Sequence, residues 1–106
     1  MKDLDRTLRE YALRAISDDY EEFERILQEV TGWAAERGLT PDRSSTLRAL
    51  EELIRDGYAQ AYILSAAPPG KAEAVSYSLD RLDELWFYVT PKGKQLARQL
   101  HKEWGG

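Results

Sequence analysis

The sequence contains no cysteine and only one histidine, His101, among its 106 residues. The absence of cysteine excludes disulfides, thiolate metal sites and a cysteine nucleophile. One histidine cannot form the histidine clusters that bind zinc. Neighbouring acids such as Glu51 and Glu52 point in different directions from a helix, so they do not form a catalytic pair, and no glycine-rich phosphate loop is present. We therefore expect no metal, no cofactor and no enzymatic activity.

Long apolar segments are also lacking, since no window approaches ~18 consecutive apolar residues. Residues 1–6 alternate in charge and lack the apolar core of a signal peptide. We expect a cytoplasmic protein without a membrane partner. Apolar residues make up 42% of the chain, which is enough for one buried core. A length of 106 residues suits one domain, so we expect residues 1–106 to fold as a single domain.

Positive charge is scarce overall, because the formal net charge is −4. This balance weighs against a protein that coats polyanions. The charge is nevertheless unevenly distributed. Residues 18–36 contain seven acids and one base, whereas residues 85–106 contain four bases and one acid. We expect the acidic segment to face water or a basic partner, and any anion-binding surface to lie toward the C-terminal end.

The first half of the chain has the apolar spacing of helices. Residues 3–16 form one amphipathic pattern. Ser17, followed by acids that favour the first turn of a helix, predicts a second helix that begins there and stops at Gly38. Thr40 as cap and Pro41 in the first turn predict a third helix. This helix is expected to end at Asp56-Gly57. Its buried face is expected to consist of four apolar residues: Leu47, Leu50, Leu53 and Ile54.

After Gly57 the pattern changes to that of strands. Residues 58–64 and 85–89 are rich in aromatic and β-branched residues and predict a hairpin. Residues 66–74 contain a proline–glycine cluster that predicts an exposed loop. Residues 75–84 fit either a strand or a helical turn, so the sequence leaves their structure open. Thr90 and Pro91 predict the cap and first residue of a last helix.

Two segments resemble bacterial regulators of the PadR and MarR types. Ser44 to Tyr58, with its hydroxyl-rich start and its Leu-Glu-Glu-Leu-Ile-Arg-Asp-Gly run, resembles their third helix and its exit. Residues 86–94, with Val-Thr-Pro-Lys-Gly, resemble the turn by which such domains leave the wing. The resemblance implies an α+β, mostly helical winged helix, with three N-terminal helices, a β-hairpin wing and a C-terminal helix. It implies a fold more firmly than an activity.

DNA is the partner that this resemblance implies, for a small bacterial transcriptional regulator. In winged helices that bind DNA the third helix usually enters the major groove and the wing contacts the backbone. The helical step predicts that Ser45, Arg48, Glu52 and Arg55 face outward. Glu52, near the centre of this face, would repel phosphates, and an ordinary solvated face is the alternative. The candidate DNA contacts are Arg43, Ser44, Ser45, Arg48, Arg55 and Lys71.

A protein partner is the competing hypothesis, in which the winged helix serves as an interaction module or adaptor without binding DNA. The hairpin region supports it, because it contains more aromatic side chains than a small core needs: Tyr58, Tyr62, Tyr77, Trp86 and Tyr88. A homodimer is a related hypothesis, because such regulators often pair through their terminal helices. The candidate dimer contacts are Leu4, Leu8, Tyr11, Leu96, Leu100 and Trp104.

Overall fold

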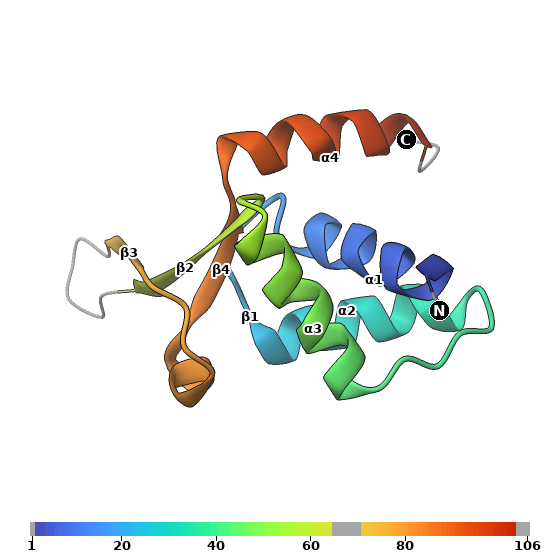
Figure 1. Ribbon diagram of the computed structural model, residues 1–106, viewed down its shortest axis with the longest axis horizontal. Helices are drawn as coiled ribbons and strands as arrows, with labels where there is room; N and C mark the ends of the chain where they lie inside the picture. Colours follow the sequence, from blue (N-terminus) through green and yellow to red (C-terminus); the bar gives the residue numbers. More distant parts are fainter. Residues whose placement is uncertain (1, 65–70, 104–106) are drawn as a thin grey trace.

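The computed structural model describes residues 2–64 and 71–103 and shows an α+β fold (Figure 1). Most of the described chain is helical, as predicted, and the strands form one small antiparallel sheet. The helices are α1 (Lys2–Ala15), α2 (Phe23–Ala35), α3 (Arg43–Arg55), the 3-10 helix η1 (Leu79–Glu84) and α4 (Pro91–Glu103). The strands are β1 (Glu21–Glu22), β2 (Ala59–Leu64), β3 (Ala72–Val75) and β4 (Trp86–Val89).

The four strands lie in the order β1-β4-β2-β3. The predicted pairing of the strands now labelled β2 and β4 is confirmed, with Ala59 opposite Val89 and Tyr62 opposite Trp86. Burial alternates along β4 and over residues 59–62 of β2, because successive side chains point to opposite faces of a sheet. The sheet therefore has an inner, buried face and an outer face on which the side chains are partly exposed.

Helices α1, α2 and α3 lie together on one side of the sheet, and α4 runs beside α1 (Figure 1). Helix α1 is the centre of this arrangement because it contacts each of the other three α-helices. Its Leu8 and Leu13, and Ile16 just after it, are fully buried, and they pack with Phe87 from the inner face of the sheet in one core. The hydrophobic core thus joins the N-terminal helices to the last strand.

The first predicted helix is confirmed, but the predicted start of the second is wrong. Ser17 does not cap a helix; its hydroxyl donates to the Leu13 carbonyl oxygen at 2.6 Å, at the end of α1. The chain then extends to form β1, and α2 begins only at Phe23. The cause lies in Tyr20, whose ring packs on Tyr62 and Tyr88 of the sheet and holds this segment extended.

The turn into α3 also differs from the prediction. Thr40 and Pro41 precede the helix, and Asp42 is the N-cap residue, whose carboxylate accepts a hydrogen bond from the backbone N–H of Ser45 at 2.8 Å. The ends of α2 and α3 are as expected. Gly38 and Gly57 follow them with φ of 72° and 84°, a left-handed conformation that glycine adopts without steric cost.

The segment between β2 and β4 contains a strand and a 3-10 helix, which its loop-forming composition did not predict. Residues 72–74, expected in an exposed loop, belong to β3 and pair with β2, so this part of the prediction is wrong. The proline–glycine cluster at 66–70 lies outside the described residues. Both alternatives for residues 75–84 occur in part, since Val75 ends a strand and Leu79 begins η1.

The start of α4 matches the prediction closely. Thr90 precedes the helix and its Oγ1 accepts a hydrogen bond from the backbone N–H of Gly93 at 3.0 Å. The same hydroxyl donates to the carbonyl oxygen of Gly57 at 2.6 Å, and the backbone N–H of Thr90 donates to the Tyr58 carbonyl oxygen at 3.0 Å. The first turn of α4 is therefore tied to the turn that joins α3 to β2.

Candidate nucleic-acid interface

The exposed side of α3 differs from the one predicted. Its buried residues are Thr46, Ala49, Leu50 and Leu53, whereas Leu47 and Ile54, expected inward, are only partly buried at the edge of the core. With 3.6 residues per turn, the direction opposite the buried side is that of Ser44, Arg48 and Arg55, all three exposed. The outward stripe of α3 is therefore rotated relative to the prediction.

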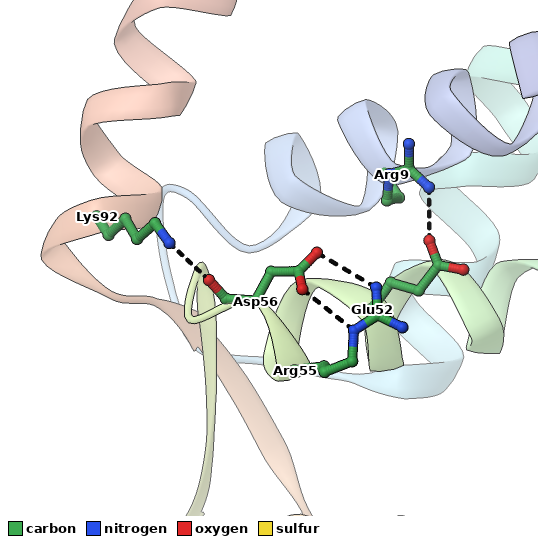
Figure 2. Close-up of polar contacts among 5 residues, drawn as sticks. All are labelled: Arg9, Glu52, Arg55, Asp56 and Lys92. Carbon is green, nitrogen blue, oxygen red and sulfur yellow. Dashed lines mark hydrogen bonds and ion pairs between the residues drawn. The ribbon is translucent and has the colours of Figure 1, made fainter.

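Glu52 is the main correction, because it was expected near the centre of the exposed face. It lies instead toward α1, where its carboxylate pairs with the guanidinium of Arg9 at 2.5 Å (Figure 2). The Arg9 side chain is 37% exposed and that of Glu52 22%, so the pair is partly shielded from water. Glu52 thus joins two helices and does not present a free negative charge to a partner of α3.

Glu51, the neighbouring acid, is held on the other flank of α3. Its carboxylate accepts a hydrogen bond of 2.7 Å from the hydroxyl of Tyr77, which lies between β3 and η1. Burial, together with this hydrogen bond, raises the pKa of Tyr77 well above its usual range. The hydroxyl therefore stays protonated and remains a donor, and the Glu51 charge is directed toward the sheet.

Arg48 is the cation best placed to meet a partner on α3. It is exposed, and of the arginines on α3 it alone has no described ion pair. Arg55 is also exposed, but its guanidinium binds the carboxylate of Asp56, with the nearest approach at 3.1 Å (Figure 2). This hydrogen bond lowers the pKa of Asp56 and raises that of Arg55. The carboxylate would oppose any phosphate bound by Arg55.

The remaining candidates for DNA contact are placed unevenly. Arg43 pairs with Glu24 of α2 at 2.5 Å and lies over the Phe23 ring, so it must leave an ion pair to bind phosphate. The Ser45 hydroxyl is already bonded to Asp42, whereas Ser44 is exposed on the first turn of α3. Lys71 is exposed and directly precedes β3, the strand that pairs with β2, so it does not belong to α3.

The candidate dimer contacts fall mostly inside the chain itself. Leu8, Tyr11 and Leu100 are 0%, 8% and 8% exposed, so they pack in this chain's own core and offer no surface to a second copy. Leu4 and Leu96 are partly buried. Trp104 lies outside the described residues.

The aromatic residues proposed as protein-binding anchors are likewise packed against the core or the sheet. All five rings, on Tyr58, Tyr62, Tyr77, Trp86 and Tyr88, are partly buried. Within residues 2–64 and 71–103, Leu79 on η1, at 57% exposure, is the single large hydrophobic side chain that is mostly exposed.

Reasoning from the sequence missed the residues that hold the α3 acids. Arg9 and Tyr77 are 43 and 26 positions away from their partners Glu52 and Glu51. A spacing of that kind leaves no local pattern. Lys92 is a further case, because its ammonium donates to the Asp56 carbonyl oxygen at 2.8 Å and links α4 to the end of α3 (Figure 2).

The described part of the chain lacks the features of a metal site and of a membrane-spanning helix. Its His, Asp and Glu residues form no group of three that suits a metal ion. None of its helices combines the length and the hydropathy needed to span a bilayer. No family model, curated protein or solved structure matches the chain.

Proposed function

We propose that the chain is a winged-helix DNA-binding protein, acting as a small transcriptional regulator of the kind that the PadR and MarR resemblance implies. In this proposal α3 enters the major groove and the β2–β3 hairpin contacts the backbone. The order of elements supports it, because three helices precede a β-hairpin and a last helix. So does the sheet, in which the short strand between α1 and α2 pairs with the strand that returns from the hairpin.

The observation that carries the proposal is the state of the acids on α3. Glu52 is paired with Arg9, and the Glu51 carboxylate accepts a hydrogen bond from the Tyr77 hydroxyl, so both carboxylates are held by other elements of the fold. Arg48 is left facing outward with Ser44. Arginine in this position can bind phosphate or pair in a bidentate manner with guanine.

The number of cations sets the expected strength of binding. Three phosphate contacts, from Arg43, Arg48 and Lys71, give a slope of about −2.7 in a plot of log K against log salt, so affinity falls ~40-fold between 50 and 200 mM salt. Removing one contact reduces the slope by about 0.9, so affinity then falls only ~12-fold over the same range. This is weak, salt-dependent binding, as expected of one copy on mixed-sequence DNA.

The test is fluorescence anisotropy with a labelled mixed-sequence duplex at 50 and 200 mM salt. We expect binding near 10⁻⁵ M at the lower salt and a smaller salt slope for Arg48→Ala. Arg37→Ala is the matched control, because Arg37 is exposed just after the end of α2, outside α3 and the β2–β3 hairpin, and we expect it to keep the wild-type slope. Circular dichroism of both variants checks that the fold is retained.

Two results would contradict the proposal. One is no salt-dependent binding at ~10⁻⁵ M, which leaves the protein-interaction module as the function to pursue. The other is an equal reduction of the salt slope in the Arg48 and Arg37 variants, which would show that α3 is not the contact surface. A palindromic operator additionally needs two copies, so light scattering at micromolar concentration tests whether the chain pairs, using surface other than Leu8, Tyr11 and Leu100.

A further inference from the structure

Three tyrosines gather on the outer face of the sheet, the face turned away from α1, α2 and α3. Tyr20 stacks on Tyr88, with ring centroids 4.8 Å apart and 28° between the planes. It meets Tyr62 edge-on, at 5.0 Å and 90°. The three rings come from the segment before β1, from β2 and from β4, so the backbone pairing of the sheet fixes their relative positions. We call this group the tyrosine cluster.

A hollow of about 610 Å³ adjoins the tyrosine cluster, within the size range of small-molecule sites. Lys94 and Arg98, one turn apart on α4, form its charged side, and the Lys94 ammonium lies 5.3 Å from the centre of the Tyr88 ring. Gln60 and Gln95 add amide groups. Among the described residues that line the hollow there is no carboxylate, although the protein as a whole is acidic.

Positive charge continues beyond this hollow. A second hollow of about 580 Å³ shares Lys94 and Arg98 and is lined by Arg14 and Lys102 as well, with Asp18 as its one acid among the described lining residues. The two hollows therefore meet along Lys94 and Arg98. The sequence predicts that any anion-binding surface lies toward the C-terminal end, and the basic side chains of these hollows lie on α4 and α1 rather than on α3.

We propose that the tyrosine cluster, with Lys94 and Arg98, binds a small molecule made of a planar ring and a phosphate, in the class of the nucleoside monophosphates. The rings offer faces and edges for stacking, and such contacts are favourable for every nucleobase. Lysine and arginine neutralise the phosphate, and arginine does so with paired hydrogen bonds. A purely apolar partner would leave both cations without a counter-charge, so the charge of the site favours an anion.

This site is distinct from the α3 part of the proposed DNA surface, although β2 and β3 line it as well. It lies on the outer face of the sheet and on α4, whereas Arg48 and Ser44 lie on α3, which packs on the inner side. A ligand in the hollow contacts Lys94 and Arg98 at the first turns of α4, which are tied to the end of α3 through Lys92 and Thr90. The first turns of α4 thus border both the hollow and the turn that follows α3.

The test is isothermal titration of the full chain with adenosine monophosphate, adenosine and ribose 5-phosphate. The monophosphate carries ring and charge, and each fragment carries one of them. We expect the monophosphate to bind at least about tenfold more tightly than either fragment, in line with the energy of stacking one base on aromatic side chains, and to bind more weakly as salt is added. Tyrosine chemical shifts in NMR spectra locate the site.

Variants separate the cluster from general charge effects. Arg98→Gln, on an exposed side chain, should weaken the monophosphate about fivefold or more while leaving adenosine unchanged. Tyr88→Leu should weaken both the monophosphate and adenosine but not ribose 5-phosphate, provided circular dichroism shows the wild-type fold. Arg37→Gln, an exposed arginine outside the hollow, is the charge control and should bind as the wild type does.

Three outcomes would overturn the proposal. One is no binding of the monophosphate at about 10 mM, beyond the millimolar range of weak ligands. Another is equal binding of the monophosphate and ribose 5-phosphate, which would show a general anion effect without the rings. The third is an equal loss in the Arg98 and Arg37 variants, which would show that binding follows net charge alone.

Discussion

Gly93 allows a sharp test of how α4 is attached to the rest of the protein. This glycine is buried in the first turn of α4, and a Cβ built on it would lie 2.1 Å from the carbonyl oxygen of Tyr58 and 3.2 Å from the Val89 Cβ. Contacts under 3.0 Å are essentially never seen for Cβ atoms. The close approach explains why glycine follows Thr90 by three residues in the Val-Thr-Pro-Lys-Gly turn.

Gly93→Ala combines two opposed effects. Alanine is favoured over glycine in a helix by about 1 kcal/mol. Overpacking costs about 1–3 kcal/mol, and the upper end applies because the atom in the way belongs to the backbone. Moving α4 away also strains the hydrogen bond from the Thr90 N–H to the Tyr58 carbonyl oxygen, worth about 1 kcal/mol. We expect a net destabilisation of about 2–3 kcal/mol.

Urea unfolding, followed by circular dichroism at equilibrium, measures this change, and the melting temperature should fall by roughly 8–15 °C. Gly32→Ala is the matched control. Gly32 is exposed within α2 and a Cβ there meets nothing within 4 Å. Its variant should be more stable by about 0.5–1 kcal/mol. If Gly93→Ala were as stable as the wild type while Gly32→Ala gained stability, the inference that α4 packs tightly against the α3–β2 turn would be refuted.

Three further changes probe the contacts that position α3 and α4. Tyr77→Phe should cost about 1–2 kcal/mol, because the partly buried Glu51 carboxylate loses its donor. Since the pKa of Tyr77 is raised, wild-type stability should fall as pH rises above ~10, where only the unfolded chain loses this proton, and the variant should lack that part of the fall. The hydrogen bonds from Ser45 lower the pKa of Asp42, so stability should decrease as pH drops below ~4; melting curves of Asp42→Asn should show a smaller decrease. Thr90→Val removes both hydrogen bonds of that hydroxyl and should lower the unfolding free energy by about 1–2 kcal/mol in urea titrations.

Local rules accounted for much of the fold. Gly38, Gly57 and the Thr90-Pro91 cap act through backbone conformation and hydrogen bonds within a few residues, so the sequence alone reveals them. The start of α2 did not follow from such rules. Acids after Ser17 suit a helix, but the Tyr20 ring packs against β2 and β4, and this distant contact holds the segment extended.

The candidate interface was harder to predict because its electrostatics depend on distant partners. The sequence shows Glu51 and Glu52 among the arginines of α3, which indicates a mixed face. The rotation of the helix depends on which residues α1 and the sheet cover, and Thr46 and Ala49, rather than Leu47 and Ile54, are buried beside Leu50 and Leu53. That rotation, which tertiary packing sets, moves Glu52 from the centre of the exposed face to its flank.

Net charge is therefore a poor guide to what this protein binds. Its −4 is a sum over the chain, but a ligand responds to the charges within about a Debye length of roughly 10 Å. Around Arg48, Glu52 is paired with Arg9, whereas the Glu51 carboxylate keeps its charge and accepts a hydrogen bond from Tyr77. The hollow beside Lys94 has no acid in its described lining. An acidic protein can thus present separate basic surfaces, provided that its acids are paired internally or gathered elsewhere, as seven of them are in residues 18–36. Because Arg9 pairs with Glu52 beside α3, replacing Arg9 would leave a free Glu52 charge at the edge of the proposed interface. If α3 binds DNA as proposed, this replacement should weaken the binding without removing any DNA contact.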